Sequence, residues 1–306
     1  MSSLVKVAVA QLKSTSDKAV NFATLSRLAS EAAANNATFL FLPEVCNFMS
    51  SSAAQTLSNA ELLPSVGATP PHSTSTSLAH LSDLATEHSL WISGTLHEQV
   101  STDRTKVYNT HVILDPSGTL KAKYRKIHLF DIDIPTASPP VKLLESNSTT
   151  PGDAATLLHN TPLGTIGLAT CYDIRFSSLA DTLRYAGGAD VLLYPSAFTL
   201  PTGRQLWEPL LRARAAETQT FVIASAQVGI HNEKRRSFGH AIVANPWGET
   251  IADAGGWDAD REVETLPAIE DINVYADIDM SLIARVRTSI PVTNHRRSNL
   301  TIENFF

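Results

Sequence analysis

Apolar positions fall into short runs along this chain, and the runs predict strands that alternate with helices from end to end. Segments that are apolar throughout or at every second residue, and rich in β-branched side chains, are typical of strands in a core. They are 4–11 (LVKVAVAQ), 37–44 (ATFLFLPE), 90–96 (LWISGTL), 165–170 (TIGLAT), 190–196 (DVLLYPS), 221–227 (FVIASAQ) and 273–279 (NVYADID). Two hairpins are also expected, with turns at 115–118 (DPSG) and 245–248 (NPWG).

Apolar residues spaced three and four apart predict helices between these strands. Such patterns lie at 22–32, 78–85, 176–186, 207–218 and 281–288. Ser16 or Asp17 can cap the first helix, and Gly187 can end the third. Residues 48–76 favour a loop or a short irregular helix. Residues 127–162 contain no convincing element, which in a compact domain indicates a functional loop.

Composition limits the classes of protein that fit this pattern. The 306 residues are 43% apolar, and no linker divides them, so residues 1–306 are predicted to form one α/β domain with mixed sheets covered by helices. The net charge of −6 repels phosphate backbones, so we expect no nucleic-acid partner. No stretch reaches 18 consecutive apolar residues, so we expect no membrane span. Two cysteines without a CxxC pair predict neither a disulfide framework nor a zinc site. They favour a reducing, cytosolic setting, with a mitochondrial one as the alternative.

Three predicted strands end on chemically active side chains, namely Glu44, Lys126 and Cys171. Ligands of α/β sheets gather beyond the carboxyl ends of the strands, so a carboxylate, an ammonium and a thiol delivered there would form a catalytic group. Each residue also has a structural interpretation. Glu44 can be a solvent-exposed carboxylate at the end of a strand, Lys126 can be part of a solvent-exposed basic segment, and Cys171 can be a buried, inert thiol. Cys46 fits that inert interpretation better.

The local sequence also predicts protonation states. Cys171 stands between a strand and a helix, and a nearby cation and helix N-terminus would lower its pKa and favour the thiolate. Five apolar residues and a proline precede Glu44, so burial is expected to raise its pKa and make it a general base. His128 and His240 are expected to be structural residues.

Several other chemistries lack their motifs in this sequence. GxGxxG after a strand, GxxxxGK[ST], HExxH and GxSxG are all absent, which argues against dinucleotide, P-loop, zincin and serine-elbow sites. A Cys–His hydrolase stays open as an alternative, with His128 as its candidate base. A non-catalytic binding protein is a second alternative.

Longer motifs around the three side chains resemble the nitrilase (carbon–nitrogen hydrolase) superfamily over about 5–299. They are LPE at 42–44, YRKIHLFDIDIP at 124–135, GLATCYDIRF at 167–176, YPSAF at 194–198, WEPLLRARAAETQ at 207–219 and NPWG at 245–248. The resemblance implies a four-layer α-β-β-α sandwich that dimerises sheet to sheet. It also implies a Glu44–Lys126–Cys171 triad, a second glutamate at Glu145, and no metal or cofactor.

Two further segments, 145–149 (ESNST) and 231–240 (HNEKRRSFGH), are similar to the Nit branch of this superfamily, whose amidases act on deaminated glutathione. Omega-amidases acting on α-ketoglutaramate are the alternative. Either activity implies a small anionic amide as substrate. The resemblance suggests that Phe198 and Thr202 line the acyl pocket. If Cys171 attacks the amide carbon, we expect the Lys126 ammonium and the backbone N–H of Tyr172 to hold the oxyanion.

Arginines near these motifs can contact the anionic ends of such a substrate. Arg175 can bind a carboxylate or hold its helix by a salt bridge, and Arg235 and Arg236 can meet a distal carboxylate or merely add surface solubility. The family's usual Pro-Glu after CYDIRF is replaced by Ser177-Ser178, which puts the first helical turn in question.

Overall fold

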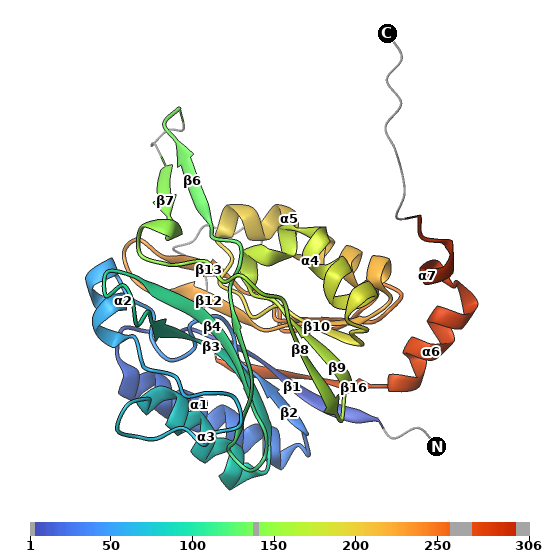
Figure 1. Ribbon diagram of the computed structural model, residues 1–306, viewed down its shortest axis with the longest axis horizontal. Coiled ribbons are helices and arrows are strands. Elements are labelled where there is room, and N and C mark those ends of the chain that lie inside the picture. The colour runs from blue at the N-terminus through green and yellow to red at the C-terminus, as the bar shows by residue number, and fades with distance from the viewer. Residues whose placement is uncertain (1–3, 137–140, 258–270, 298–306) are drawn as a thin grey trace.

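Two β-sheets packed face to face form the centre of the molecule, which we describe from a computed structural model for residues 4–136, 141–257 and 271–297 (Figure 1). The first sheet has the strand order β13-β12-β1-β2-β3-β4-β5, with β16 pairing antiparallel to β1. Its strands are β1 (Val5–Leu12), β2 (Phe39–Phe41), β3 (Trp91–Gln99), β4 (Val107–Leu114), β5 (Leu120–Arg125), β12 (Ala226–Ile230), β13 (Arg236–Phe238) and β16 (Ile272–Ile278).

The second sheet has the order β15-β14-β11-β10-β9-β8. Its strands are β8 (Thr156–Thr161), β9 (Gly164–Leu168), β10 (Val191–Leu193), β11 (Phe221–Ala224), β14 (Ile242–Ala244) and β15 (Thr250–Asp253). A separate hairpin, β6 (Asp131–Ile134) with β7 (Val141–Leu144), projects from the body of the molecule (Figure 1).

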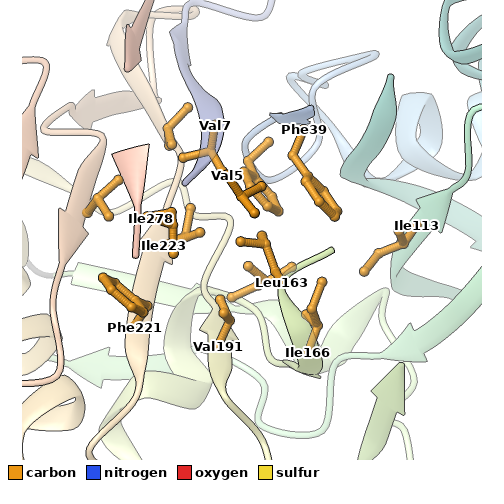
Figure 2. Close-up of a cluster of buried hydrophobic side chains, with 14 of the residues drawn as sticks. Val5, Val7, Phe39, Ile113, Leu163, Ile166, Val191, Phe221, Ile223 and Ile278 are labelled. Atoms are coloured by element: carbon orange, nitrogen blue, oxygen red, sulfur yellow. The ribbon is translucent and has the colours of Figure 1, made fainter. Parts of the chain in front are cut away.

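The inward faces of both sheets share one hydrophobic core, in which Val7 and Phe39 of the first sheet lie with Ile166, Val191 and Ile223 of the second (Figure 2). Alternating side chains of the same strands point outward under helices. Helices α1 (Lys18–Ala34) and α3 (Thr76–His88) cover the first sheet, and α4 (Ser177–Asp181) and α5 (Leu200–Thr218) cover the second. The layers are therefore α-β-β-α, as the family resemblance implies.

The remaining helices lie outside these layers. They are α2 (Ala53–Asn59), α6 (Met280–Ser289) and α7 (Val292–His295). Of the two caps expected for α1, Ser16 and Asp17, the structure has Asp17, whose side chain accepts from the N–H groups of Ala19 and Val20. Ser177-Ser178 does not prevent a helical turn, because α4 begins at Ser177 and continues as a turn through Thr182–Ala186 to Gly187.

Two predictions about the elements are wrong. The segment 221–227 is not one strand: it breaks at Ser225 into β11 of the second sheet and β12 of the first, and Ser225 Oγ donates to the Leu42 carbonyl at 2.9 Å. The segment 127–162 is not a loop without elements, because it forms β6, β7 and β8. The sequence also favours a loop at 254–270, most of which lies outside the described residues.

Candidate active site

Glu44, Lys126 and Cys171 come from three loops at the ends of different strands, and the fold brings them to one cavity. Glu44 follows β2, Lys126 directly follows β5, and Cys171 begins the short 3₁₀ helix Cys171–Arg175 after β9. Because β2 and β9 belong to different sheets, the cavity lies where the two sheets meet at this end. This juxtaposition is the one that the strand-end argument predicts.

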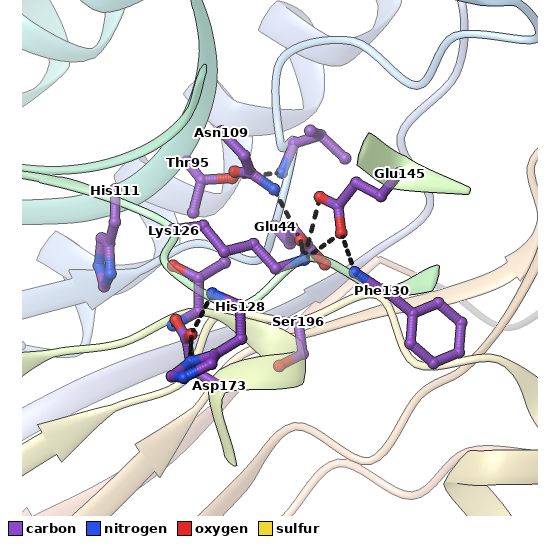
Figure 3. A network of polar contacts seen from close by, with 12 residues as sticks. Glu44, Thr95, Asn109, His111, Lys126, His128, Phe130, Glu145, Asp173 and Ser196 are labelled. Atoms are coloured by element: carbon purple, nitrogen blue, oxygen red, sulfur yellow. Dashed lines mark hydrogen bonds and ion pairs between the residues drawn. The ribbon is translucent and has the colours of Figure 1, made fainter. Parts of the chain in front are cut away.

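The Lys126 ammonium lies between two carboxylates (Figure 3). Lys126 Nζ donates to Glu44 Oε1 at 3.2 Å, and to Oε1 and Oε2 of Glu145 at 3.1 and 2.9 Å. Asn109 Nδ2 also donates to Glu44 Oε1, at 2.8 Å, and the backbone N–H of Phe130 donates to Glu145 Oε2 at 2.7 Å. Since Lys126 and Glu44 are only 2% and 3% exposed, these contacts fix both groups in position.

The nucleophile candidate sits on a sharply turned backbone. Cys171 has φ +49°, a left-handed conformation that is uncommon for a residue with a Cβ, and its N–H donates to the Pro195 carbonyl at 3.1 Å. The side chain lines the cavity and is 9% exposed. The thiol is within hydrogen-bonding reach of the Glu44 carboxylate and of the Ala197 backbone. A reactive sulfur with a carboxylate beside it can lose its proton to that carboxylate when it attacks.

Both protonation states predicted from the sequence are wrong. Burial raises the pKa of the Cys171 thiol, and the Glu44 charge raises it further, so the resting group is a thiol. Burial also favours the neutral form of Glu44, but the charges of Lys126 and Arg235 and the hydrogen bonds outweigh it and lower the Glu44 pKa. The pKa of Lys126 rises despite its burial, because Glu145 and Glu44 stabilise the ammonium. The site at rest is therefore thiol, carboxylate and ammonium.

A vacant hydrogen-bond donor lies next to the thiol. The N–H of Cys171 is used by Pro195 and that of Asp173 by the Thr170 carbonyl, whereas the described residues provide no acceptor for the N–H of Tyr172. The first N–H groups of a helical turn have no partner within the turn. The Tyr172 N–H and the Lys126 ammonium can together hold an oxygen anion at the carbon that the sulfur attacks.

Asp173 anchors the turn that carries Cys171. Its buried carboxylate accepts from Tyr124 Oη at 2.7 Å, from the Thr170 N–H at 2.9 Å and from the His128 N–H at 3.1 Å. His128 Nδ1 is 2.7 Å from the same carboxylate, and the ring stacks on Phe176. His128 is thus a structural residue, as predicted, and it does not line the cavity with Cys171. This arrangement removes the candidate base of the Cys–His alternative.

The cavity has a volume of about 670 Å³, enough for a small-molecule ligand. All the residues predicted to form the site line it: Glu44, Lys126, Glu145, Cys171, Tyr172, Arg175, Phe198, Thr202, Arg235 and Arg236. Sequence reasoning missed Asn109, which holds Glu44, and His97, which lines the wall near Glu44. Asn109 lies in a strand of the predicted hairpin and His97 directly follows the predicted strand 90–96, and nothing in the strand pattern sets either residue apart.

Cys46 and His240 are structural residues outside the cavity. Cys46 is fully buried under the first sheet, and burial raises its pKa to about 12, in agreement with the inert interpretation. His240 Nδ1 is 3.0 Å from Asp253 Oδ2, as expected for a structural residue. Over the described ranges, no three His, Cys, Asp or Glu side chains are grouped as metal ligands, and no helix has the length and apolar character to cross a bilayer.

The four-layer fold, with a thiol, an ammonium and two carboxylates in one cavity, is that of an enzyme that hydrolyses carbon–nitrogen bonds. A family model described as carbon-nitrogen hydrolase matches residues 6–288. The chain belongs to the carbon–nitrogen hydrolase family.

Relatives of known name place the chain within one part of that family. It is 42% identical over 297 residues to human deaminated glutathione amidase, covering 96% of this chain and 83% of the human one. It is 41% identical to the nitrilase and fragile histidine triad fusion protein NitFhit of Drosophila melanogaster, covering 96% of this chain but 58% of the fusion protein. The crystal structure of Saccharomyces cerevisiae Nit3, a member of branch 10 of the nitrilase superfamily, matches with a TM-score of 0.79 at 30% identity and covers 96% of this chain and 97% of that chain.

Proposed function

We propose that this protein is a thiol amidase that hydrolyses deaminated glutathione to α-ketoglutarate and cysteinylglycine. The observation that carries the proposal is the buried Lys126 ammonium between Glu44 and Glu145, in the same cavity as the Cys171 thiol. The identity of 42% with the human deaminated glutathione amidase supports the choice of substrate.

In the acylation step, Cys171 Sγ attacks the amide carbon while its proton passes to the Glu44 carboxylate. The carbonyl oxygen becomes an anion, which the Lys126 ammonium and the Tyr172 N–H stabilise. Loss of one such donor elsewhere lowers the rate roughly 10²–10³-fold. Glu44 then gives the proton to the amine nitrogen, the C–N bond breaks, and cysteinylglycine leaves an α-ketoglutaryl thioester on Cys171.

In the deacylation step, Glu44 takes a proton from a water molecule that attacks the thioester carbon. The same two donors hold the second oxyanion. When it collapses, the C–S bond breaks and the proton held by Glu44 returns to the sulfur. Glu145 supports both steps through Lys126, whose ammonium it keeps charged and pointed at the cavity. No added cofactor enters this sequence of steps.

The acyl end of the substrate belongs on the nucleophile's side of the cavity. Arg175 follows Cys171 by four residues, is exposed at the cavity wall, and can bind the keto-acid carboxylate with two parallel hydrogen bonds. Phe198, just before α5, provides an apolar face for the rest of the acyl group, and Thr202, in the first turn of α5, provides a hydroxyl. Thr202 Oγ1 is 2.8 Å from Thr199 Oγ1, which fixes its direction.

The test is an assay of α-ketoglutarate release from deaminated glutathione by the wild type, Cys171→Ala and Cys46→Ala. Cys171→Ala should abolish turnover with an unchanged circular dichroism spectrum, and Cys46→Ala is the matched control at the other cysteine. Mass spectrometry of the quenched wild type should detect an α-ketoglutaryl adduct on the Cys171 peptide. Turnover by Cys171→Ala would refute the mechanism, and a folded but inactive wild type would favour the binding-protein alternative.

Omega-amidase activity on α-ketoglutaramate is the second candidate, because that substrate has the same acyl group and needs the same nucleophile. The ratio of kcat/KM for the two substrates decides between them. We also propose a homodimer, which sedimentation equilibrium would test, and a reducing compartment such as the cytosol, because the mechanism requires a free Cys171 thiol. A substrate with two carboxylates rather than a nucleic acid or a membrane is the partner that these residues fit.

A further inference from the structure

Arg235 is a half-buried cation on the cavity wall for which the described residues provide no ion-pair partner. Other partly buried arginines of the chain are paired or hydrogen-bonded: Arg287 binds Asp190 at 2.9 Å, and Arg184 Nε donates to the Thr218 carbonyl at 2.9 Å. The charge of Arg235 reaches the catalytic centre, because it helps to lower the pKa of Glu44. A guanidinium kept partly out of water without a carboxylate is a receptor for an anion.

The loop before β13 is built to hold Arg235 in place. Asn232 Oδ1 accepts from the N–H groups of Lys234 and Arg235, both at 3.0 Å, and so closes a tight turn. At the base of this turn, His231 Nδ1 is 2.8 Å from the Ser14 carbonyl and His231 Nε2 is 2.8 Å from Ser237 Oγ. With both ring nitrogens of His231 engaged, the turn is fixed to β13 and to the loop that follows β1.

His97 lies on the same wall and also lacks a partner. Its ring lines the cavity, and within the described part of the chain no hydrogen bond to either ring nitrogen is found. Burial lowers its pKa to about 4, and the charges around it include Glu44 and Arg235. At neutral pH the ring is therefore uncharged, with one nitrogen that donates and one that accepts. Such a ring is suited to an amide group rather than to an anion.

The mechanism decides which end of the substrate faces this wall. Glu44 must deliver its proton to the departing nitrogen, so the leaving amine lies on the Glu44 side of the attacked carbon. Arg235 and His97 line the same cavity as Glu44, and the charges of Arg235 and Glu44 act on each other and on the His97 ring, so both residues lie near Glu44. In cysteinylglycine the terminal carboxylate is about 7 Å from the departing nitrogen when the two residues are extended. One peptide group lies between them.

We propose that Arg235 and His97 form a leaving-group subsite, in which Arg235 binds the terminal carboxylate of the departing dipeptide and His97 binds its peptide group. The subsite makes the enzyme prefer an amide whose amine carries a carboxylate over a primary amide that releases ammonia. This inference rests on the proposed function, because it takes Glu44 as the proton donor to the leaving nitrogen.

The test compares two substrates that share the α-ketoglutaryl group and differ in the leaving group, deaminated glutathione and α-ketoglutaramate. For Arg235→Gln, the ratio of kcat/KM for the first to that for the second should fall about 30-fold, as expected for loss of a charge-assisted pair. The ratio cancels any effect on Glu44 that both substrates experience. For His97→Leu, the ratio should fall about 10-fold. Arg104→Gln removes the same charge from an exposed arginine outside the cavity and should lower the ratio less than threefold.

A synthetic substrate completes the cycle. In α-ketoglutaryl-Cys-Gly amide the terminal carboxylate is replaced by a carboxamide. The kcat/KM of the wild type should be about 30-fold lower for this amide than for deaminated glutathione. The kcat/KM of Arg235→Gln should be almost the same for the two substrates. If Arg104→Gln lowers the ratio as much as Arg235→Gln, or if Arg235→Gln lowers kcat/KM equally for both natural substrates, the subsite assignment is wrong.

A failure of the proposed function gives a different result. If the wild type cleaves neither substrate, the function fails, and calorimetric binding of deaminated glutathione to Cys171→Ala then tests the subsite alone. Weaker binding by Cys171→Ala/Arg235→Gln than by Cys171→Ala/Arg104→Gln would support the subsite. Equal binding by the two double variants would overturn it.

Discussion

At the scale of single residues, burial and pairing act in opposite directions on the groups of the site. Burial by itself would neutralise both Lys126 and Glu44, yet each keeps the other charged at a separation of 3.2 Å. Cys171 has no such compensation, because the nearby Glu44 charge adds to the effect of burial. The ammonium and the carboxylate are therefore ready for use, and the thiol loses its proton when it attacks.

These protonation states predict a flat pH profile for kcat/KM, which reports the groups of the free enzyme. The Glu44 pKa is below its ordinary value of 4.5, so lowering the pH from 8.5 to 5.5 leaves the base ionised. The pKa of Cys171 is above 9.0 and that of Lys126 well above 10.5, so raising the pH over the same interval changes neither. We expect less than about a threefold change in kcat/KM for deaminated glutathione from about pH 5.5 to 8.5.

The opposite result would be a bell-shaped pH profile, in which kcat/KM falls on both sides of a maximum near neutral pH. Such a bell would indicate a thiolate paired with a histidine cation, or a Glu44 pKa raised by burial as the sequence alone predicts. Circular dichroism at each pH is the control, since loss of fold at either end also lowers activity.

At the scale of elements, the sequence predicts which segments are strands and helices better than it predicts the sheet to which each strand belongs. The segment 221–227 has uninterrupted strand character, and periodicity contains no sign that Ser225 divides it between two sheets. At the break Ser225 makes a tertiary contact, its hydrogen bond to the Leu42 carbonyl, which no local pattern contains. The hairpin β6–β7 was missed for a related reason: most of its side chains are exposed, so no alternation with a buried face marks it.

The site residues could be predicted where a reactive side chain directly follows a predicted strand. Glu44, Lys126 and Cys171 follow apolar strands, and the family motifs around them identify Glu145. Asn109 and His97 lie inside β4 and β3, where a polar residue is indistinguishable from one that simply faces outward. Their roles depend on which strands lie beside the cavity, and this is a property of the assembled sheet.

A prediction at this scale concerns the contact between α5 and β13. A Cβ on Gly203 would overlap the ring of Phe238 in β13, the strand that follows Arg235. Alanine favours the helix by about 1 kcal/mol, but overpacking costs about 1–3 kcal/mol, so we expect a net loss of stability. Gly203→Ala should lower the free energy of unfolding by about 1 kcal/mol in urea titrations and lower kcat/KM for deaminated glutathione.

Gln205→Ala is the matched control, because Gln205 is exposed on the same helix and its substitution changes only local helix propensity. If Gly203→Ala is as stable as Gln205→Ala, then β13 can move away from α5 without loss, and the close contact does not hold the Arg235 loop in place.

At the scale of the whole molecule, net charge and local charge have opposite signs. The chain carries a net charge of −6, which repels an anionic substrate at long range. The cavity wall nevertheless carries Arg175, Lys234, Arg235 and Arg236, for which the described residues form no ion pairs. The field that a substrate meets at the opening is therefore set by this cluster, and the rest of the surface acts against it.

The sign of the salt dependence distinguishes these two fields. If the basic cluster dominates, salt screens an attraction, and kcat/KM for deaminated glutathione should fall about fivefold between ionic strengths of about 0.01 and 0.2 M. If the net charge dominates, salt screens a repulsion and kcat/KM should rise. We expect the fall, with a smaller one for α-ketoglutaramate, which carries one carboxylate instead of two. Arg235→Gln should reduce the slope for deaminated glutathione more than Lys121→Gln, an exposed lysine of β5 outside the cavity. A slope that is unchanged by Arg235→Gln would mean that this residue takes no part in attracting the substrate.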